Sequence, residues 1–221
     1  MSLVLDLDGT LISCEPRQSA VLRAALVACR VDADVSAVWR MKRAGASTRQ
    51  ALISLGVPRA AAEQVAKAWH GMIEAPGWLA LDSILPGVVE TLRDMRAAGF
   101  ELALLTARSR KEWVLPQLSR LGLAGCFDTI SVVAAADAKQ AKTAHLRQGF
   151  VPGFFGDTES DMRAADDAQV PFFPVATGQR DETFLASVGR KPIYADLSEA
   201  WKAFLAHDSR PFGEARGYTE F

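Results

Sequence analysis

Residues 3–10 place a short apolar run directly before two acidic residues and a tight turn. In this run Leu, Val and Leu precede Asp6 and Asp8, and Gly9 and Thr10 follow. Because successive side chains of a strand point to opposite faces, we expect Asp6 and Asp8 to point the same way where the strand ends, and Gly9 to allow the sharp turn. Two carboxylates in one crevice can act as a nucleophile and a general acid/base, and they can hold a hard cation such as Mg²⁺. The alternative is an acidic turn after an edge strand.

Strands and helices alternate along the part of the chain after residue 86. A helix from about Val88 ends at Gly99, and a strand over 100–105 follows it. The alternation continues with helices at 110–121, 139–148 and 161–169 and with strands at 129–134, 153–155, 172–175 and 193–194. Pro116 should kink the 110–121 helix or delay its start, because proline lacks the N–H group. This pattern indicates an α/β fold, a Rossmann-like parallel sheet with helices on both faces and ligands at the carboxyl ends of its strands.

Residues 14–84 show no strand pattern and read as consecutive helices. The predicted helices cover 19–30, 35–43, 48–55 and 58–73, and Pro58 suits a first helical position. We therefore expect a core domain formed by 1–13 and 85–207, and an all-helical domain formed by 14–84. Residues 208–221 mix polar, Gly and Pro residues and are expected to form a C-terminal tail.

The composition is that of an ordinary globular protein, with 221 residues, 49% hydrophobic content and a net charge of −1. A dedicated nucleic-acid or membrane surface would need a basic excess that this chain lacks. No apolar run approaches the ~20 residues that span a bilayer. We therefore expect a cytoplasmic protein, monomeric or homodimeric, that acts on small molecules rather than on nucleic acid or membranes.

A second predicted strand end supplies Thr106, followed by Ala107, Arg108 and Ser109. A hydroxyl group and exposed backbone N–H groups at a helix start can cradle phosphate oxygens. A simple helix cap with the same Thr-X-X-Ser spacing is the alternative.

Two further sets of charged residues follow in the same half of the chain. Lys139 and Lys142 lie at the beginning of a predicted helix, where a cation is unfavourable with the helix dipole and invites an anionic partner, although a solvated lysine would look the same. Asp157 follows a predicted strand and Asp161 comes one helical turn later, a spacing that suits a metal and its outer shell. The alternative is a capped helix, with Ser160 or Asp157 as the cap.

Together and in this order, the four sets resemble the motifs of the haloacid dehalogenase (HAD) superfamily of phosphohydrolases. The segment 6–10 is similar to the first motif, 104–106 to the second, a lysine within 139–142 to the third, and 156–157 with Asp161 to the fourth. The resemblance covers residues 3 to about 205. It implies a phosphoglycolate-phosphatase-like member whose helical insertion is a cap that closes over the active site.

The resemblance also implies a role for each matched residue. Asp6 would be the nucleophile that forms an aspartyl phosphate, and Asp8 would be the acid/base that protonates the leaving oxygen and then activates water. Mg²⁺ would be held by Asp6, the Asp8 backbone carbonyl and Asp157, with Asp161 in the outer shell or orienting the lysine. The residues that would bind the phosphoryl group are Gly9, Thr10, Thr106, Ala107 and Arg108.

The lysine departs from the pattern of helically capped relatives, which usually place proline after it. Here Gln140 follows Lys139 and Thr143 follows Lys142. We favour Lys142, because Leu146 at i+4 can pack down while the lysine faces the site.

The presence of an acid at Asp8 points to phosphate monoesters, because relatives that cleave carbon–halogen bonds or phosphonates resemble one another in lacking it. The predicted function is a Mg²⁺-dependent phosphohydrolase acting on a small phosphorylated metabolite. Two alternatives stay open at this point. They are a phosphosugar mutase of the same fold and a non-catalytic phosphometabolite-binding protein.

The predicted cap contains a cationic segment at 39–49 that includes Lys42, Arg43 and Arg49 beside a small Gly-Ala-Ser turn. In helically capped relatives the corresponding turn faces the active site. If this segment has a functional role, one of these cations would contact an acidic or hydroxylated part of the substrate beyond its phosphate. The alternative is a solvated basic helix end.

Overall fold

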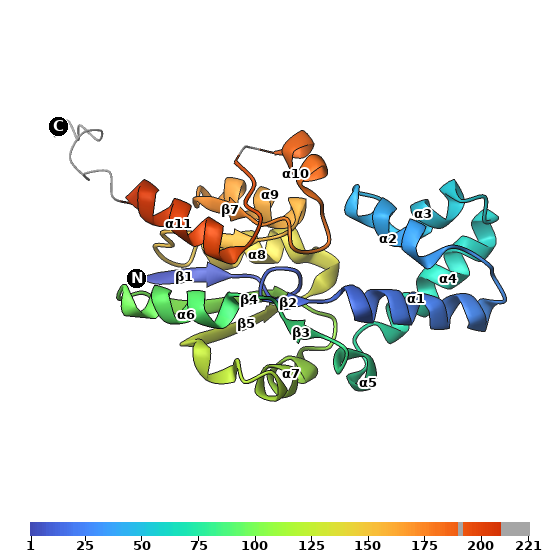
Figure 1. Ribbon diagram of the computed structural model, residues 1–221, viewed down its shortest axis with the longest axis horizontal. Coiled ribbons are helices and arrows are strands. Elements are labelled where there is room, and N and C mark those ends of the chain that lie inside the picture. The colour runs from blue at the N-terminus through green and yellow to red at the C-terminus, as the bar shows by residue number, and fades with distance from the viewer. Residues whose placement is uncertain (190–191, 209–221) are drawn as a thin grey trace.

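The computed structural model describes residues 1–189 and 192–208. Its two parts lie end to end in Figure 1, a sheet covered by helices and a group of helices at one end of it. The predicted C-terminal tail at 208–221 lies outside the described residues except for its first position. Among the helices of the described ranges, none has the length and apolar character that a membrane crossing requires.

A five-stranded parallel sheet forms the core, in the order β5-β4-β1-β6-β7. The strands are β1 (Ser2–Leu5), β4 (Glu101–Ala107), β5 (Thr129–Val133), β6 (Phe154–Gly156) and β7 (Phe172–Pro174). In the register of the central strand, Leu5 lies opposite Leu104 on one side and Phe155 on the other. The carboxyl ends of these strands therefore bring the segments after β1, β4 and β6 to one edge of the sheet.

Helices cover both faces of this sheet, which confirms the predicted fold class. On one face the side chains of Leu3 and Leu5 pack with α6 (Val88–Ala97), α7 (Val114–Arg120) and α11 (Leu197–Asp208). On the other face Val4 packs with α8 (Ala138–Leu146) and α9 (Glu159–Ala168). The alternation of Leu3, Val4 and Leu5 between the two cores follows from the two-residue period of a strand.

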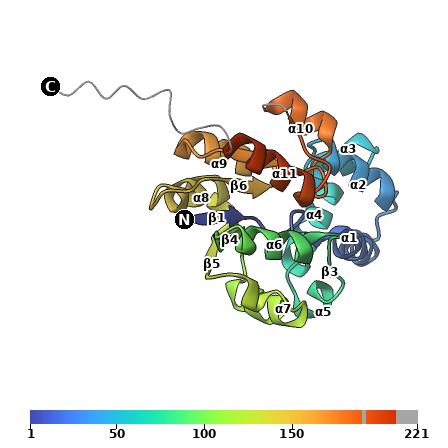
Figure 2. The same cartoon turned by 60° about the vertical axis from the view of Figure 1, so that its left-hand side comes forward.

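The second part is the predicted cap segment, which consists of helices and has a hydrophobic core of its own. Its helices are α1 (Glu15–Cys29), α2 (Val35–Arg43), α3 (Thr48–Ser54), α4 (Arg59–Met72) and α5 (Pro76–Leu79). Leu22, Leu52 and Val65 are buried against one another in this cap. Ser47 and Gln50 form a capping box that fixes the start of α3. Figure 1 shows α1–α4 as one group beyond the end of the sheet, and Figure 2 shows the same helices together at one side of the molecule.

The two connections between the parts run side by side. β2 (Ile12–Ser13) pairs antiparallel with β3 (Ser83–Ile84), so the chain leaves and re-enters the core at the same place. A backbone hydrogen bond of 3.0 Å from Leu85 N to Leu11 O continues this pairing. Segments of two residues carry too little periodicity to be recognised in a sequence, and this two-stranded pairing was not among the predicted elements.

The remaining differences from the predicted elements have local causes. α1 begins at Glu15 rather than at 19, with Pro16 in its first turn. The 110–121 helix is delayed, as Pro116 predicted: a 3₁₀ turn at Lys111–Trp113 precedes α7, and Pro116 lies in the first turn of α7. The strand predicted at 193–194 is a single bridge between Val175 and Tyr194. Two other 3₁₀ turns, at Ala124–Cys126 and Ala135–Asp137, and the helix α10 (Glu182–Val188), like α11, were not predicted.

Candidate active site

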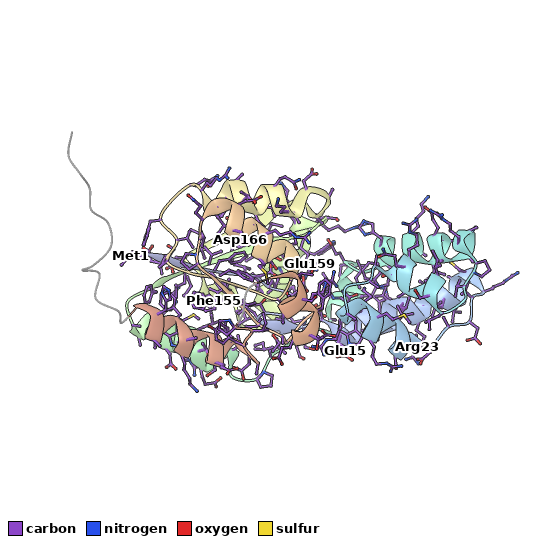
Figure 3. All side chains as sticks on the ribbon, turned by 90° about the horizontal axis from the view of Figure 1, so that it is seen from above. Met1, Glu15, Arg23, Phe155, Glu159 and Asp166 are labelled. Atoms are coloured by element: carbon purple, nitrogen blue, oxygen red, sulfur yellow. The ribbon has the colours of Figure 1, made fainter. Side chains whose placement is uncertain are left out.

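The predicted site residues gather where the carboxyl end of the sheet faces the cap. In Figure 3, Met1 lies at the far end of the core, whereas Glu159, at the start of α9, lies at the end nearer the cap. Glu15 and Arg23 mark the course of α1 away from the core in the same view. The end of β1 is therefore the place where core and cap residues meet.

Lys142 lies between two carboxylates at this end of the sheet. Its Nζ is 2.7 Å from Asp6 Oδ1 and 2.5 Å from Asp161 Oδ1, and all three side chains are buried. Thr158 donates its hydroxyl to the other oxygen of Asp161 over 2.6 Å. Thr158 is also the N-cap of α9, and its hydroxyl accepts a hydrogen bond from Asp161 N. The alternative interpretation, which named Ser160 or Asp157 as the cap, was therefore wrong about the cap residue, because Thr, Ser and Asp all suit that position.

Lys139, the competing lysine, points elsewhere. Its Nζ is 2.6 Å from Asp167, and its side chain is 38% exposed. Leu146 is buried with Val4 on the face of the sheet that α8 covers, as the i+4 argument for Lys142 required. The geometry thus brings Lys142, rather than Lys139, to the first acidic motif.

Three buried carboxylates converge around Lys142. One oxygen from each of Asp6, Asp157 and Asp161 lies within 4.8 Å of the others. Burial raises the pKa of Asp6 to about 7, although the Lys142 ammonium opposes the shift. Burial also raises the pKa of Asp157, and repulsion from Asp6 adds to it. The pKa of Lys142 is held above its usual range, because attraction to Asp161 and Asp6 outweighs the effect of burial.

This group of acids suits a divalent cation. Asp157 Oδ2 accepts a hydrogen bond from Gln179 N over 2.6 Å, while its buried Oδ1 has no hydrogen-bond partner among the described residues. An all-oxygen donor set with one unpartnered carboxylate oxygen fits Mg²⁺ better than it fits a softer metal. The side chain of Asp8 does not join this group of acids, and a contribution from its backbone carbonyl stays a prediction.

A loop after β7 holds Asp157 in place. Thr177 donates its hydroxyl to Gly9 O over 2.5 Å, and Gly178 and Gly9 both lie against the Asp157 carboxylate. A Cβ at either glycine would overlap that carboxylate, and Gly9 has a φ of +79°. The sequence analysis missed this loop. The sequence feature that could have revealed it is the Thr-Gly pair just past the carboxyl end of a predicted strand.

Asp8 faces two arginines instead of the acids. Arg17 of α1 donates to Asp8 Oδ1, and Arg108 Nη2 lies 2.7 Å from Asp8 Oδ2. Burial alone would raise the pKa of Asp8, but the Arg108 and Arg17 charges outweigh it and hold the pKa below its ordinary value. Arg17 was missed by the sequence analysis, because a charged residue early in a helix usually faces solvent.

The predicted phosphate cradle after β4 is only partly available. Arg108 N donates to Val133 O over 3.0 Å, and Ser109 N donates to the Glu74 carboxylate of the cap over 3.1 Å. The expectation that both N–H groups are exposed was therefore wrong, because a neighbouring strand and a cap side chain accept them. Thr106 is buried at the end of β4, and Ala107 is the last residue of that strand.

The first motif adds one more polar group to the buried edge. Thr10 is buried, and its Oγ1 has no partner among the residues that the structure describes. A buried hydroxyl without a partner is costly unless a ligand or water satisfies it. Its position two residues after Asp8 is consistent with the phosphate-binding role predicted for Gly9 and Thr10, which stays a prediction.

The three cations of the cap segment have different surroundings. Lys42 is buried, donates to Gln18 Oε1 over 2.7 Å, and lies 4.0 Å from the centre of the Trp69 ring. Burial lowers the pKa of Lys42 to about 7. Arg43 donates to the backbone oxygen of Ala176 in the core over 2.7 Å. Arg49 instead lines a surface depression of about 590 Å³ formed by cap residues.

The family of the chain follows from a comparison of its sequence with protein families. The model of the family described as haloacid dehalogenase-like hydrolase matches residues 2–169. The chain belongs to this family. The matched range contains the acidic pair after β1, the end of β4, Lys142 and the Asp157–Asp161 segment, which are the sets on which the resemblance was based. No curated protein matches the chain significantly.

Solved structures show the same fold over nearly the whole chain. A haloacid dehalogenase-like family hydrolase from Streptococcus pneumoniae is 16% identical with a TM-score of 0.72, covering 94% of this chain and 97% of its own. A predicted phosphoglycolate phosphatase from Haemophilus somnus is 21% identical with a TM-score of 0.69, covering 91% and 96%. A beta-phosphoglucomutase candidate from Thermotoga maritima is 21% identical with a TM-score of 0.64, covering 93% and 98%. At these identities the similarity shows that the chain shares the fold of these proteins over nearly its whole length.

Proposed function

We propose that this HAD-family hydrolase is a Mg²⁺-dependent phosphatase that cleaves phosphate monoesters of small molecules through an aspartyl phosphate on Asp6. The observation that carries the proposal is the position of Lys142, which bridges Asp6 and Asp161 beside the unpartnered oxygen of Asp157. A buried cation next to a buried carboxylate nucleophile is suited to a phosphoryl group, whose negative charge it can share.

The steps of the reaction use Asp6, Asp8 and Lys142. A carboxylate oxygen of Asp6 attacks phosphorus and the ester P–O bond breaks. Asp8, which the two arginines favour as a carboxylate, first takes up a proton from solvent and then gives it to the leaving oxygen. Asp8 then takes a proton from water, which attacks phosphorus and releases inorganic phosphate with Asp6 restored. Lys142 neutralises charge on Asp6 and on the phosphoryl oxygens throughout. When bound, Mg²⁺ would be held by Asp6, Asp157 and the Asp8 backbone carbonyl and would add positive charge at the phosphoryl oxygens.

Bound Mg²⁺ would also keep the nucleophile Asp6 in its reactive, ionised form. Burial raises the pKa of Asp6 to about 7, so a large share of this carboxyl is protonated at neutral pH in the protein by itself. A divalent cation beside it favours the carboxylate, because opposite charges stabilise each other strongly in a buried site. Metal binding and activation of Asp6 are thus linked.

The cap residue best placed to contact the rest of the substrate is Lys42. It is buried, and among the described residues its ammonium donates a hydrogen bond to the Gln18 amide and lies over the Trp69 ring, with no carboxylate within ion-pair distance. Arg43 is occupied by the Ala176 carbonyl, and Arg49 faces the surface depression. A buried ammonium with neutral partners favours an anionic ligand, which supports a substrate with an acidic group besides its phosphate.

The proposal is tested by release of inorganic phosphate from a panel of phosphorylated metabolites, with Mg²⁺ and with chelator. We expect metal-dependent release from at least one compound by the wild-type protein and none by Asp6→Asn, with Lys139→Ala as a matched active control. Equal activity in chelator would overturn the metal assignment, and an active Asp6→Asn would overturn the covalent one. Isomerisation of a sugar phosphate without release of phosphate would assign a mutase instead, and binding without turnover would assign a non-catalytic role.

A further inference from the structure

Asp8 belongs to a closed ring of buried side chains. Arg17 Nε donates to Asp82 Oδ1 over 3.0 Å, and Asp82 Oδ2 accepts from Gln117 Nε2 over 2.7 Å. Gln117 Oε1 accepts from Arg108 Nη2 over 3.3 Å, and Arg17 and Arg108 both bind Asp8. Except for Asp8, whose side chain is 15% exposed, every member of the ring is buried.

The ring crosses the junction between cap and core twice. Arg17 and Asp82 belong to the cap, one shortly after β2 and the other directly before β3, and Arg17 Nη1 also donates to Ile73 O at the end of α4 over 3.1 Å. Asp8 and Gln117 belong to the core. The two crossings are the Arg17–Asp8 and Gln117–Asp82 bonds, and both lie beside the β2–β3 pair through which the chain leaves and re-enters the core.

We infer that Arg17 is a positioning residue for Asp8, the carboxyl group that protonates the leaving oxygen. Through this ring, Arg17 connects the cap to that carboxyl group. The inference rests on the proposed function, in which Asp8 is the general acid. Arg17 uses all three of its nitrogen positions, on Asp8, Asp82 and the Ile73 carbonyl, so its guanidinium has one orientation. A carboxyl group held from two sides by fixed guanidinium groups keeps its direction, and general acid catalysis depends on that direction.

A purely structural role for Arg17 predicts a different result from a positioning role. If the ring only stabilises the junction, its loss weakens folding and affects all substrates alike. If the ring orients the general acid, its loss matters most where the leaving oxygen needs a proton. An alkoxide leaving group needs that proton, whereas dinitrophenolate leaves readily without it.

The experiment compares kcat/KM of Arg17→Lys and wild type on an alkyl phosphate and on dinitrophenyl phosphate, with Mg²⁺ present. This parameter reports the steps up to transfer to Asp6, in which Asp8 acts as the acid. Lysine keeps the charge but cannot bind Asp8 and Asp82 together. We expect a loss of roughly 30- to 100-fold on the alkyl ester and of less than about threefold on the dinitrophenyl ester. Equal losses on both esters would overturn the inference.

Arg120→Met is the matched control, because Arg120 also joins core to cap. Its Nη2 donates to the carbonyl oxygens of Leu79 and Asp82, each over 3.0 Å, without touching Asp8. This variant should keep the wild-type ratio of the two rates, and a shifted ratio would assign the effect to the junction in general. If Arg17→Lys does not fold, Gln117→Met opens the ring from the core side and should change the ratio in the same direction by about tenfold. An unchanged ratio there would overturn the inference.

Asp8→Asn separates this inference from the proposed function. Under the proposed function it loses far more rate on the alkyl ester than on the dinitrophenyl ester. If Asp8→Asn shows no such difference, the role of Asp8 as the acid fails. If Asp8→Asn shows it and Arg17→Lys does not, only the positioning role of Arg17 fails.

Discussion

Replacing Lys142 by alanine removes the only described cation that bonds Asp6 and Asp161. Breaking a buried ion pair from one side leaves uncompensated charge and costs about 3–5 kcal/mol. For a chain of 221 residues each kcal/mol lowers Tm by roughly 2–4 °C, so Tm should fall by roughly 6–20 °C. Loss of a positioned charge at the reacting phosphoryl group should lower kcat by about 100- to 1,000-fold.

Lys139→Ala is the comparison for this variant, because Lys139 lies three residues earlier on the same helix. Its ion pair with Asp167 is exposed, and exposed pairs contribute about 0–1 kcal/mol. Its Tm should change by no more than about 4 °C and its kcat should stay near the wild-type value. Thermal melts followed by circular dichroism, and initial rates on nitrophenyl phosphate, measure both quantities.

The outcome that refutes this reasoning is a folded Lys142→Ala protein with a rate within about tenfold of wild type. A greater loss in Lys139→Ala would transfer the role to that lysine. Lys142→Met, which keeps the aliphatic stem, tests the same point if the alanine variant is too unstable at the assay temperature. Its rate should be as low as that of the alanine variant.

Three further predictions concern metal and pH. Mg²⁺ should activate the enzyme, EDTA should silence it and Ca²⁺ should inhibit it, because the larger Ca²⁺ shell disturbs in-line geometry; full activity in chelated buffer would contradict this. The raised pKa values of Asp6 (about 7) and Asp157 mean that stability of the metal-free protein falls as pH rises through the range from about 4 to 7. Asp157→Asn should therefore raise the Tm of the metal-free protein at neutral pH. In the wild type, Mg²⁺ at a hundredfold excess over Kd should raise the free energy of unfolding by about 2.7 kcal/mol, and the variant should lose this stabilisation. A lower metal-free Tm in the variant would contradict the prediction. Because the pKa of Lys42 is lowered to about 7, Lys42 loses its positive charge above that pH. KM for an anionic substrate should then rise by up to about tenfold per pH unit in the wild type but stay level in Lys42→Arg. KM values that change with pH in the same way in both proteins would contradict the contact.

The elements around the sheet were predictable because local patterns determine them. The two-residue period of β1 and the parallel order of the strands place the residues after β1, β4 and β6 at one edge. The choice of Lys142 followed from helical spacing, since Leu146 packs on the sheet one turn later. These inferences need only the neighbours of a residue along its own strand or helix.

The ring around Asp8 was not predictable from such patterns. Arg17 and Asp82 are 65 positions apart, and Gln117 is 35 positions from Asp82, so only the folded chain brings them together. The loop with Gly178, which positions Asp157, lies past the last clear strand and has no period. α10 and α11 were also missed, and length alone does not account for this, because α3 is as short as α10 and was predicted.

The covalent step on Asp6 is tested most directly by trapping it. Acid-quenched protein taken during turnover is reduced with borohydride, which converts an aspartyl phosphate to homoserine, and its peptides are sequenced by mass spectrometry. We expect homoserine at position 6 only in samples that contained substrate and Mg²⁺, and none in Asp6→Asn or at Asp8. Homoserine at another acidic residue, or its absence from position 6 during rapid turnover, would contradict the proposed mechanism.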